Sequence, residues 1–155
     1  GAGGLRARAT ECVGLCALAL GADSFRPLAA NACAAAVAGL GSIGKDGKDS
    51  EVAEYTYGFA AHMAALYKEQ LDAQFVHALL PHALAACAAD EVVEQGGDGE
   101  GGGDGGDEEG DVQYGLHSGV LDEKSSAVHT VGRLCKHCAP QLGAAGALAC
   151  VRALA

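Results

Sequence analysis

Apolar residues recur every three to four positions in six segments of this 155-residue chain, and the segments fall into three pairs. The first segments of the pairs begin near residues 5, 50 and 119, and the second segments begin near residues 24, 72 and 140. The first and second pairs start about 45 residues apart, and the second and third pairs start about 69 residues apart. The second spacing falls to about 47 residues once a stretch of ~22 residues rich in Gly and acids is treated as a loop. A pattern repeated at this period predicts antiparallel helix pairs stacked on one another.

The composition also favours helices over strands. Hydrophobic residues make up 50% of the chain but aromatic residues only 5%, and most apolar side chains are Ala or Leu. We therefore predict an all-α fold, a HEAT-repeat α-solenoid (a superhelix of antiparallel helix pairs) of about three repeats. The chain starts at Gly1 without Met and ends at Ala155 in an apolar run, so we expect a piece of a longer protein whose third pair is truncated at its C-terminal side.

Each predicted helix has an apolar stripe that we expect to face the core. The stripe of the first helix, over residues 5–20, consists of Leu5, Cys12, Cys16 and Leu20. The stripe of the third helix consists of Val52, Tyr55, Phe59, Met63, Leu66 and Tyr67. The stripe of the fifth helix consists of Leu121, Val128, Val131, Leu134, Cys135 and Cys138. The stripe of the last helix, which Pro140 opens, consists of Leu142, Leu148, Val151 and Leu154.

Charge divides the chain into three regions. The formal net charge is −10, and ten of the twenty acids lie between Asp90 and Asp111, where there is no Lys or Arg. A stretch made largely of Gly and acids buries too little apolar area to offset the entropy of ordering it. We therefore predict two HEAT helix pairs in residues 1–90, an acidic Gly-rich disordered insert in residues 91–117 and a third HEAT helix pair in residues 118–155.

The acidic insert suits a basic protein partner. Binding of nucleic acid is not expected, because the chain has no Lys/Arg cluster that would release counterions from phosphates. Long-range attraction would raise the rate at which a basic surface is captured more than the final affinity. The residues predicted to bind protein in this way are Asp104, Asp107, Glu108, Glu109 and Asp111. The competing interpretation is a solvated linker that only keeps the chain soluble.

Three blocks of sequence resemble one region of the importin-beta (karyopherin-beta) family, in receptors of the importin beta-3 type. They are residues 5–12 (LRARATEC), 54–60 (EYTYGFA) and 119–127 (GVLDEKSSA). The resemblance extends over most of residues 5–155, and the Gly-rich part of the insert is the main departure. It implies a superhelical receptor that binds the GTPase Ran, cargo with basic nuclear-localisation signals and Phe-Gly nucleoporins, and that shuttles between cytoplasm and nucleus. The alternative is a HEAT scaffold or regulatory subunit of a complex unrelated to transport.

Catalytic and metal sites find little support in the sequence. Cys135 and Cys138 form a CxxC with a His between them, but no second CxxC or HxxxH supplies further zinc ligands, and two cysteines at i and i+3 suit a helix core. The Asp-Gly-Glu spacing in residues 98–109 lacks a ligand and an apolar anchor of a calcium loop. The four histidines on predicted helices, which have no carboxylate at hydrogen-bonding spacing, are His62, His77, His82 and His129.

We therefore expect no enzyme activity, no metal and no cofactor, and a metal- or redox-active helical protein is the third possibility. The seven cysteines lie in apolar runs, which is typical of small buried side chains in a reducing compartment. No run of 18 uncharged apolar residues is present, so no membrane association is expected.

Overall fold

The computed structural model describes residues 2–43, 50–89 and 118–155, and the regular elements in these ranges are all helices. The predicted all-α fold is therefore confirmed. The first two helices are α1 (Ala2–Leu20) and α2 (Ala22–Gly41). The middle of the chain forms α3 (Ser50–Tyr67), the single-turn 3-10 helix η1 (Lys68–Gln70) and α4 (Ala73–Ala88). The last two helices are α5 (Ser118–His137) and α6 (Ala139–Leu154).

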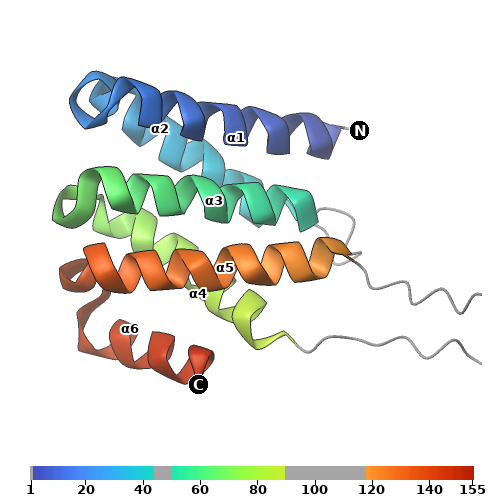
Figure 1. The fold of residues 1–155 in the computed structure, drawn as a ribbon, viewed down its shortest axis with the longest axis vertical. Coiled ribbons are helices and arrows are strands. Elements are labelled where there is room, and N and C mark those ends of the chain that lie inside the picture. The colour runs from blue at the N-terminus through green and yellow to red at the C-terminus, as the bar shows by residue number, and fades with distance from the viewer. Residues whose placement is uncertain (1, 44–49, 90–117) are drawn as a thin grey trace, which may run out of the picture.

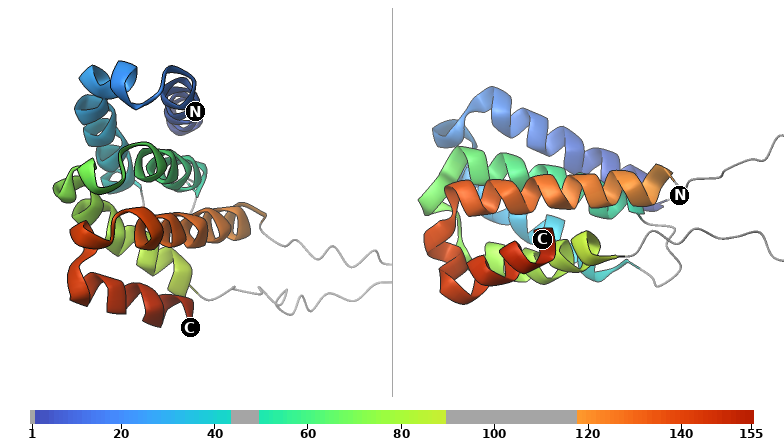
Figure 2. Two further views of the ribbon diagram at one scale, coloured as in Figure 1. Left: turned by 60° about the vertical axis from the view of Figure 1, so that its left-hand side comes forward. Right: turned by 60° about the horizontal axis from the view of Figure 1, so that its bottom comes forward.

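The helices form two layers (Figure 1). One layer holds α1, α3 and α5 side by side, and the other holds α2, α4 and α6, as the turned views of Figure 2 show. Within the first layer, contacts advance in the same direction along neighbouring helices: Arg8 of α1 meets Tyr55 of α3, and Gly14 lies against His62. The three helices of this layer are therefore parallel, and each runs antiparallel to the helix that follows it in the chain.

The predicted stripe of α1 is wrong. Leu5 is 76% exposed, and Cys12, Cys16 and Leu20 are exposed as well. The face that packs on the other helices consists instead of the small residues Ala7, Gly14 and Ala17. A helix face without bulky side chains lets α1 approach α3 closely enough for Gly14 to lie against the Phe59 ring. Close approach therefore decides which face is buried, and the larger apolar side chains stay outside.

The predicted stripe of α6 is also mostly wrong. Leu142 and Cys150 are buried, whereas Leu148, Val151 and Leu154 are exposed, with Val151 at 62%. Gly143 has φ 65° and ψ 177° in the middle of this helix, a conformation that favours glycine. The regular 3.6-residue register is broken there, so residues before and after Gly143 do not share one stripe.

On α5 the predicted stripe is right in part. Val131 and Leu134 are fully buried, together with Ala127 and Thr130. Val128 and Cys135 are exposed. They lie outside the face of α5 that packs against α3 and α4. Cys138, at the junction with α6, is buried as expected.

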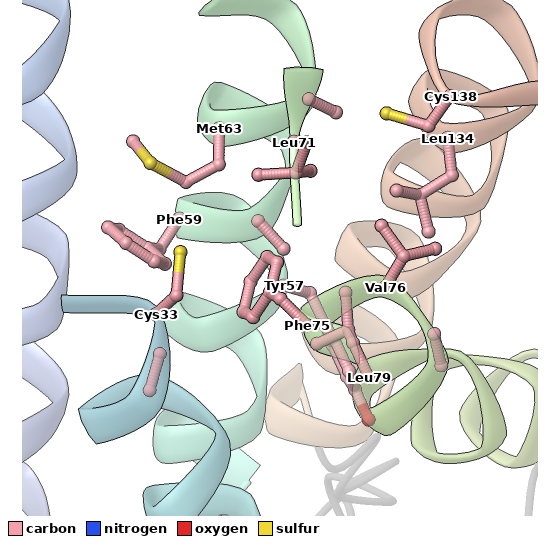
Figure 3. Close-up of a cluster of buried hydrophobic side chains, with 14 of the residues drawn as sticks. Cys33, Tyr57, Phe59, Met63, Leu71, Phe75, Val76, Leu79, Leu134 and Cys138 are labelled. Carbon is pink, nitrogen blue, oxygen red and sulfur yellow. The ribbon is translucent and has the colours of Figure 1, made fainter. Parts of the chain in front are cut away.

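The core is centred on α3, which packs against α1 on one side and α5 on the other. Four residues of its predicted stripe, Val52, Phe59, Met63 and Tyr67, are buried, and the other two, Tyr55 and Leu66, are part-buried. Tyr57, which the prediction left out, is buried as well, and Figure 3 shows it with Phe59 and Met63 between the neighbouring helices. Phe59 meets Phe75 of α4 edge to face, with ring centroids 6.4 Å apart. Large side chains therefore fill the centre, and α1 covers it with small residues, whereas α2 also contributes Phe25 and Leu40.

Side-chain hydrogen bonds to backbone carbonyls join α5 to α3. The hydroxyl of Thr130, which is fully buried, donates to the carbonyl of Tyr57 at 2.7 Å, and the hydroxyl of Ser126 donates to the carbonyl of Glu54 at 2.9 Å. A buried hydroxyl without a partner would be costly, so these bonds set how the two helices are aligned. The N-terminal half of α3 is consequently held against the middle of α5.

Gln141 joins α6 to the segment between α3 and α4. Its side-chain amide nitrogen donates to the carbonyls of Lys68 at 2.8 Å and Leu71 at 3.0 Å, and its backbone carbonyl accepts from Nε2 of His77 at 2.6 Å. The side chain is 9% exposed, so these bonds form largely away from water. One residue thereby anchors the first turn of α6 to three other residues of the second helix pair.

Candidate protein-interaction face

Five carboxylates gather on the layer formed by α1, α3 and α5. We name this group the acidic face; its members are Glu11, Glu51, Glu54, Asp122 and Glu123. The parallel arrangement of the three helices brings them together, because each helix contributes residues from its N-terminal half or middle. The Ser126 bond to the carbonyl of Glu54 holds the α3 and α5 contributions at close range.

The carboxylates repel one another. Burial raises the pKa of Glu54, and the negative charges of Asp122, Glu51 and Glu11 raise it further. Burial likewise raises the pKa of Glu123, with an added contribution from Glu54. The face therefore carries negative charge that the fold itself disfavours, and a cation placed over it would relieve this repulsion.

The pH dependence of stability follows from the direction of these shifts. The folded chain holds the Glu54 proton more tightly than the unfolded chain, so this group favours folding in acid, and that contribution is lost as pH rises through its raised pKa. We expect Glu54→Gln to raise the free energy of unfolding by a few tenths of a kcal/mol at pH 7, since Glu54 is partly solvated. At pH 3 the gain should vanish in matched urea titrations. An equal gain at both pH values would show that the gain does not come from removing the charge of Glu54. Glu69→Gln on η1 serves as the control.

Arg8 borders the acidic face and partly offsets its charge. Its guanidinium pairs with Glu11 at 3.3 Å, stacks over the Tyr55 ring at 4.8 Å from the centroid, and donates to the Tyr55 hydroxyl. Both partners of the ion pair are substantially exposed, so the pair itself stabilises the fold little. Its role is to hold one cation and one aromatic ring at the border between α1 and α3.

Lys and Arg side chains lie at the opposite end of these helices, with histidines beside them. The residues of this basic end are His62, Lys68, His129, Arg133, Lys136 and His137. Burial lowers the pKa of His62, and the neighbouring His129 and Arg133 lower it further. Helix dipoles favour this separation of charge, because Glu51 lies in the first turn of α3 and Lys136 lies in the last turn of α5. The layer is therefore polarised along the helix axes.

The residues predicted from the sequence to bind protein lie outside the described residues. They are Asp104, Asp107, Glu108, Glu109 and Asp111. The possible calcium loop at residues 98–109 also lies outside the described residues. Within them, the sequence analysis missed the acidic face. The sequence does contain a signal for this face. Glu54 and Asp122 lie early in α3 and α5, which are the first helices of two successive pairs.

Cys135 and Cys138, the CxxC motif, do not face each other. Cys138 is buried and its thiol donates to the carbonyl of Lys68 at 3.4 Å, whereas Cys135 is exposed. Across residues 2–43, 50–89 and 118–155, no three His, Cys, Asp or Glu side chains are placed to hold a metal ion. None of the six helices described has the length and apolar character needed to cross a membrane.

An apolar groove lies between α1 and α2. It has a volume of about 410 Å³, and Phe59 forms part of its lining. The remaining lining is mostly alanine, with Val13, Thr10 and Arg6 as the other larger residues. The groove offers apolar contact surface but no paired acid and base or nucleophile, so it gives no indication of a reaction.

The three sequence blocks on which the predicted resemblance to the importin-beta family rests lie on α1, α3 and α5. Residues 5–12 are in α1, residues 54–60 in α3 and residues 119–127 in α5. Glu11, Glu54, Asp122 and Glu123 of the acidic face all belong to these blocks. Comparison with models of protein families, with curated proteins and with solved structures found no match to this chain.

Proposed function

We propose that this chain is part of a HEAT-type helical scaffold that binds a basic segment of another protein on its acidic face. Three features support a solenoid of HEAT pairs: the two layers, the parallel first helices and the ~45-residue period. In such a scaffold each pair covers the apolar face of its neighbour and leaves one long surface for partners. The function is therefore binding, and no enzyme activity is proposed.

The acidic face is the observation that carries this proposal. Burial and three neighbouring carboxylates disfavour the charged form of Glu54. A Lys- or Arg-rich segment lying across α3 and α5 would replace the repulsion between carboxylates with attraction. Tyr55, held under Arg8, adds an aromatic ring at the border where a further cation can stack. The expected ligand is thus an extended basic peptide.

We further propose that the scaffold is a nuclear transport receptor of the importin-beta type. The sequence resemblance supports this class, and a basic nuclear-localisation signal is the kind of segment that the acidic face would attract. Ran and Phe-Gly nucleoporins would be its other partners, and it would shuttle between cytoplasm and nucleus. The residues 104–111 would add to the attraction of basic cargo.

A charge-neutralising triple variant tests the acidic face. We expect Glu51→Gln, Glu54→Gln and Asp122→Asn together to weaken the binding of a fluorescent Lys/Arg-rich peptide about tenfold at low salt, because three exposed attractions are lost. The matched control is Asp23→Asn, Glu69→Gln and Asp72→Asn, which changes the net charge equally but lies away from the face. Asn replaces Asp as an N-cap with little cost, so the control should fold normally.

Peptide binding by the two triple variants, measured at low and high salt, distinguishes three outcomes. The difference between the two triple variants should disappear near 0.5 M salt, where screening extends only a few ångströms. Equal weakening by both variants would mean that net charge alone attracts the peptide. Unchanged binding in both would place the site outside the described residues, for example at 104–111.

Ran distinguishes the transport receptor from other HEAT scaffolds. A pull-down of the chain on immobilised Ran, loaded with GTP in one arm and GDP in the other, should retain it selectively in the GTP arm. Retention in neither arm would contradict the receptor proposal for this chain. The proposal of a basic-peptide scaffold would stand if the acidic-face variant still binds the fluorescent peptide more weakly than its control. The two experiments therefore fail independently.

A further inference from the structure

Exposed apolar side chains gather at the two ends of the helix stack. Figure 1 shows α1 and α2 at one end, the α1–α2 end, and α5 and α6 at the other, the α5–α6 end. Among the described residues, six strongly exposed Leu and Val side chains lie on α1 and α2 and five lie on α5 and α6, whereas α3 and α4 carry none. The middle pair is covered by a neighbouring pair on each side. Large apolar side chains are therefore exposed where the stack has no neighbour.

The α1–α2 end has an apolar stripe on α1. Leu5 lies nine positions from the buried Gly14, and Cys16 lies nine positions from the buried Ala7. Nine positions correspond to about two and a half turns, so Leu5 and Cys16 point away from the buried face. Both are exposed, and so is Cys12, seven positions from Leu5 on the same side. The stripe therefore faces away from α3.

The apolar groove between α1 and α2 adjoins this stripe. Ala9 and Val13 of α1 line it on one side, and Ala32 and Ala35 of α2 line it on the other. Leu28 is exposed and lies four positions before Ala32, on the same side of α2. The groove has a volume of about 410 Å³ and is lined mostly by small side chains, so it has room for larger apolar groups.

The α5–α6 end carries larger apolar side chains. Val128 and Cys135 of α5 are exposed and lie seven positions apart, so they share one side of that helix. Leu148 and Val151 of α6 are exposed and lie three positions apart, again on one side. Bulky side chains at this end and an alanine-lined groove at the other end are complementary in shape.

We propose that a second copy of this chain docks head to tail, with its α5–α6 end on the α1–α2 end of the first copy. The contact would repeat between copies the packing that places α3 on α1 and α5 on α3 within one copy. It would cover an apolar surface on both partners, as the middle pair is covered inside the stack. A head-to-tail contact does not close on itself, so the copies would form open chains longer than a dimer.

Charge opposes this contact. The formal net charge of each copy is −10, and parallel stacking would place the acidic face of one copy beside that of the next. A contact of one helix pair on another falls at the small end of the range of about 1,200–2,000 Å² for stable complexes, so we expect a Kd on the order of 100 µM. Raising the salt concentration to about 0.5 M should strengthen the association several-fold, because repulsion is screened.

Sedimentation velocity of the full chain and of two blocked variants tests the proposal. Leu5→Glu places a charge on the α1–α2 end, and Val151→Glu places one on the α5–α6 end. Each variant alone should associate at least tenfold more weakly than the native chain, because every contact needs both ends. An equimolar mixture should form a heterodimer and nothing larger, since each variant supplies the end that the other lacks. Reductant is present throughout, because Cys12, Cys16 and Cys135 are exposed at the two ends.

Leu18→Glu is the matched control. It adds the same charge to α1 at an exposed position, seven residues from Glu11 and therefore on the side of the acidic face. It should associate like the native chain in about 0.5 M salt. Leu5 and Val151 are 76% and 62% exposed, so all three variants should keep the native circular dichroism spectrum.

Several results would overturn the proposal. A native chain that stays monomeric at about 500 µM would leave both ends to a different protein. Dimers formed by one blocked variant but not by the other would indicate a symmetric contact between two like ends. Equal weakening by all three Glu variants would mean that net charge alone controls association. Association that weakens as salt rises would indicate a contact between acidic and basic surfaces.

Discussion

Phe59→Ala should lower the free energy of unfolding by about 3–5 kcal/mol, the cost of emptying a large site in a packed core. Phe59 is 2% exposed, meets Phe75 edge to face and lies against Gly14 of α1. The helices on either side of α3 are held by further contacts, so they would close only part of the cavity. A loss of this size is a large fraction of the 5–15 kcal/mol typical of a domain.

Urea denaturation followed by circular dichroism measures this loss. Leu15→Ala on α1 removes a similar apolar volume from a side chain that is 55% exposed, and it should change stability by no more than about 0.5 kcal/mol. Comparable losses in the two variants would mean that α1 buries a face other than the one formed by Ala7, Gly14 and Ala17. The pair of variants thus also tests the orientation of α1.

Gln141→Met should lower the free energy of unfolding by about 2–3 kcal/mol, although the new side chain is of similar size and more apolar. The native amide donates to the carbonyls of Lys68 and Leu71, and the variant leaves both without this donor. Cys138 donates to the Lys68 carbonyl as well and would satisfy it in part. The loss is therefore expected below the sum of two full hydrogen-bond penalties.

Gln74→Met on α4 is the matched control, because Gln74 is exposed and only its backbone N–H is bonded, to the carboxylate of Asp72. Thermal unfolding of both variants should show a lower Tm for Gln141→Met alone. Hydrogen exchange should also become faster at the amides of α6 in that variant. A stability gain from Gln141→Met would show that apolar contact outweighs these bonds at the junction.

The sequence predicts the helices better than it predicts their buried faces. Helix α3 begins at Ser50 and helix α5 at Ser118, close to the starts predicted near residues 50 and 119. On α1, however, Ala and Gly positions alternate with Leu and Cys all around the helix, so the bulkiest stripe is a poor guide to the inner face. Helix packing selects the smallest stripe there, because it permits the closest approach.

The acidic face illustrates why the candidate site was harder to predict. Glu54 and Asp122 are far apart in the chain, and only the parallel placement of α3 and α5 brings them together. A dense run of acids attracts notice in a sequence, whereas isolated acids on different helices do not. Their shared position within the repeat becomes meaningful once the helices are known to be neighbours.

Helix α3 is covered by a helix on each side. Local unfolding should therefore require more free energy at α3 than at the outer helices. Fluctuations that detach α1 leave the contact between α3 and α5 in place, whereas fluctuations that release α3 must break its contacts with both α1 and α5. Backbone amides of α3 should accordingly be the last to exchange with solvent, and openings of lower free energy should begin at the outer helices. The acidic face includes residues of both kinds of helix. Glu54 lies on α3, which should open last, and Glu11 lies on α1, which should be among the first to detach. A partner that bridges these residues would therefore lengthen the lifetime of the whole stack as well as occupy its surface.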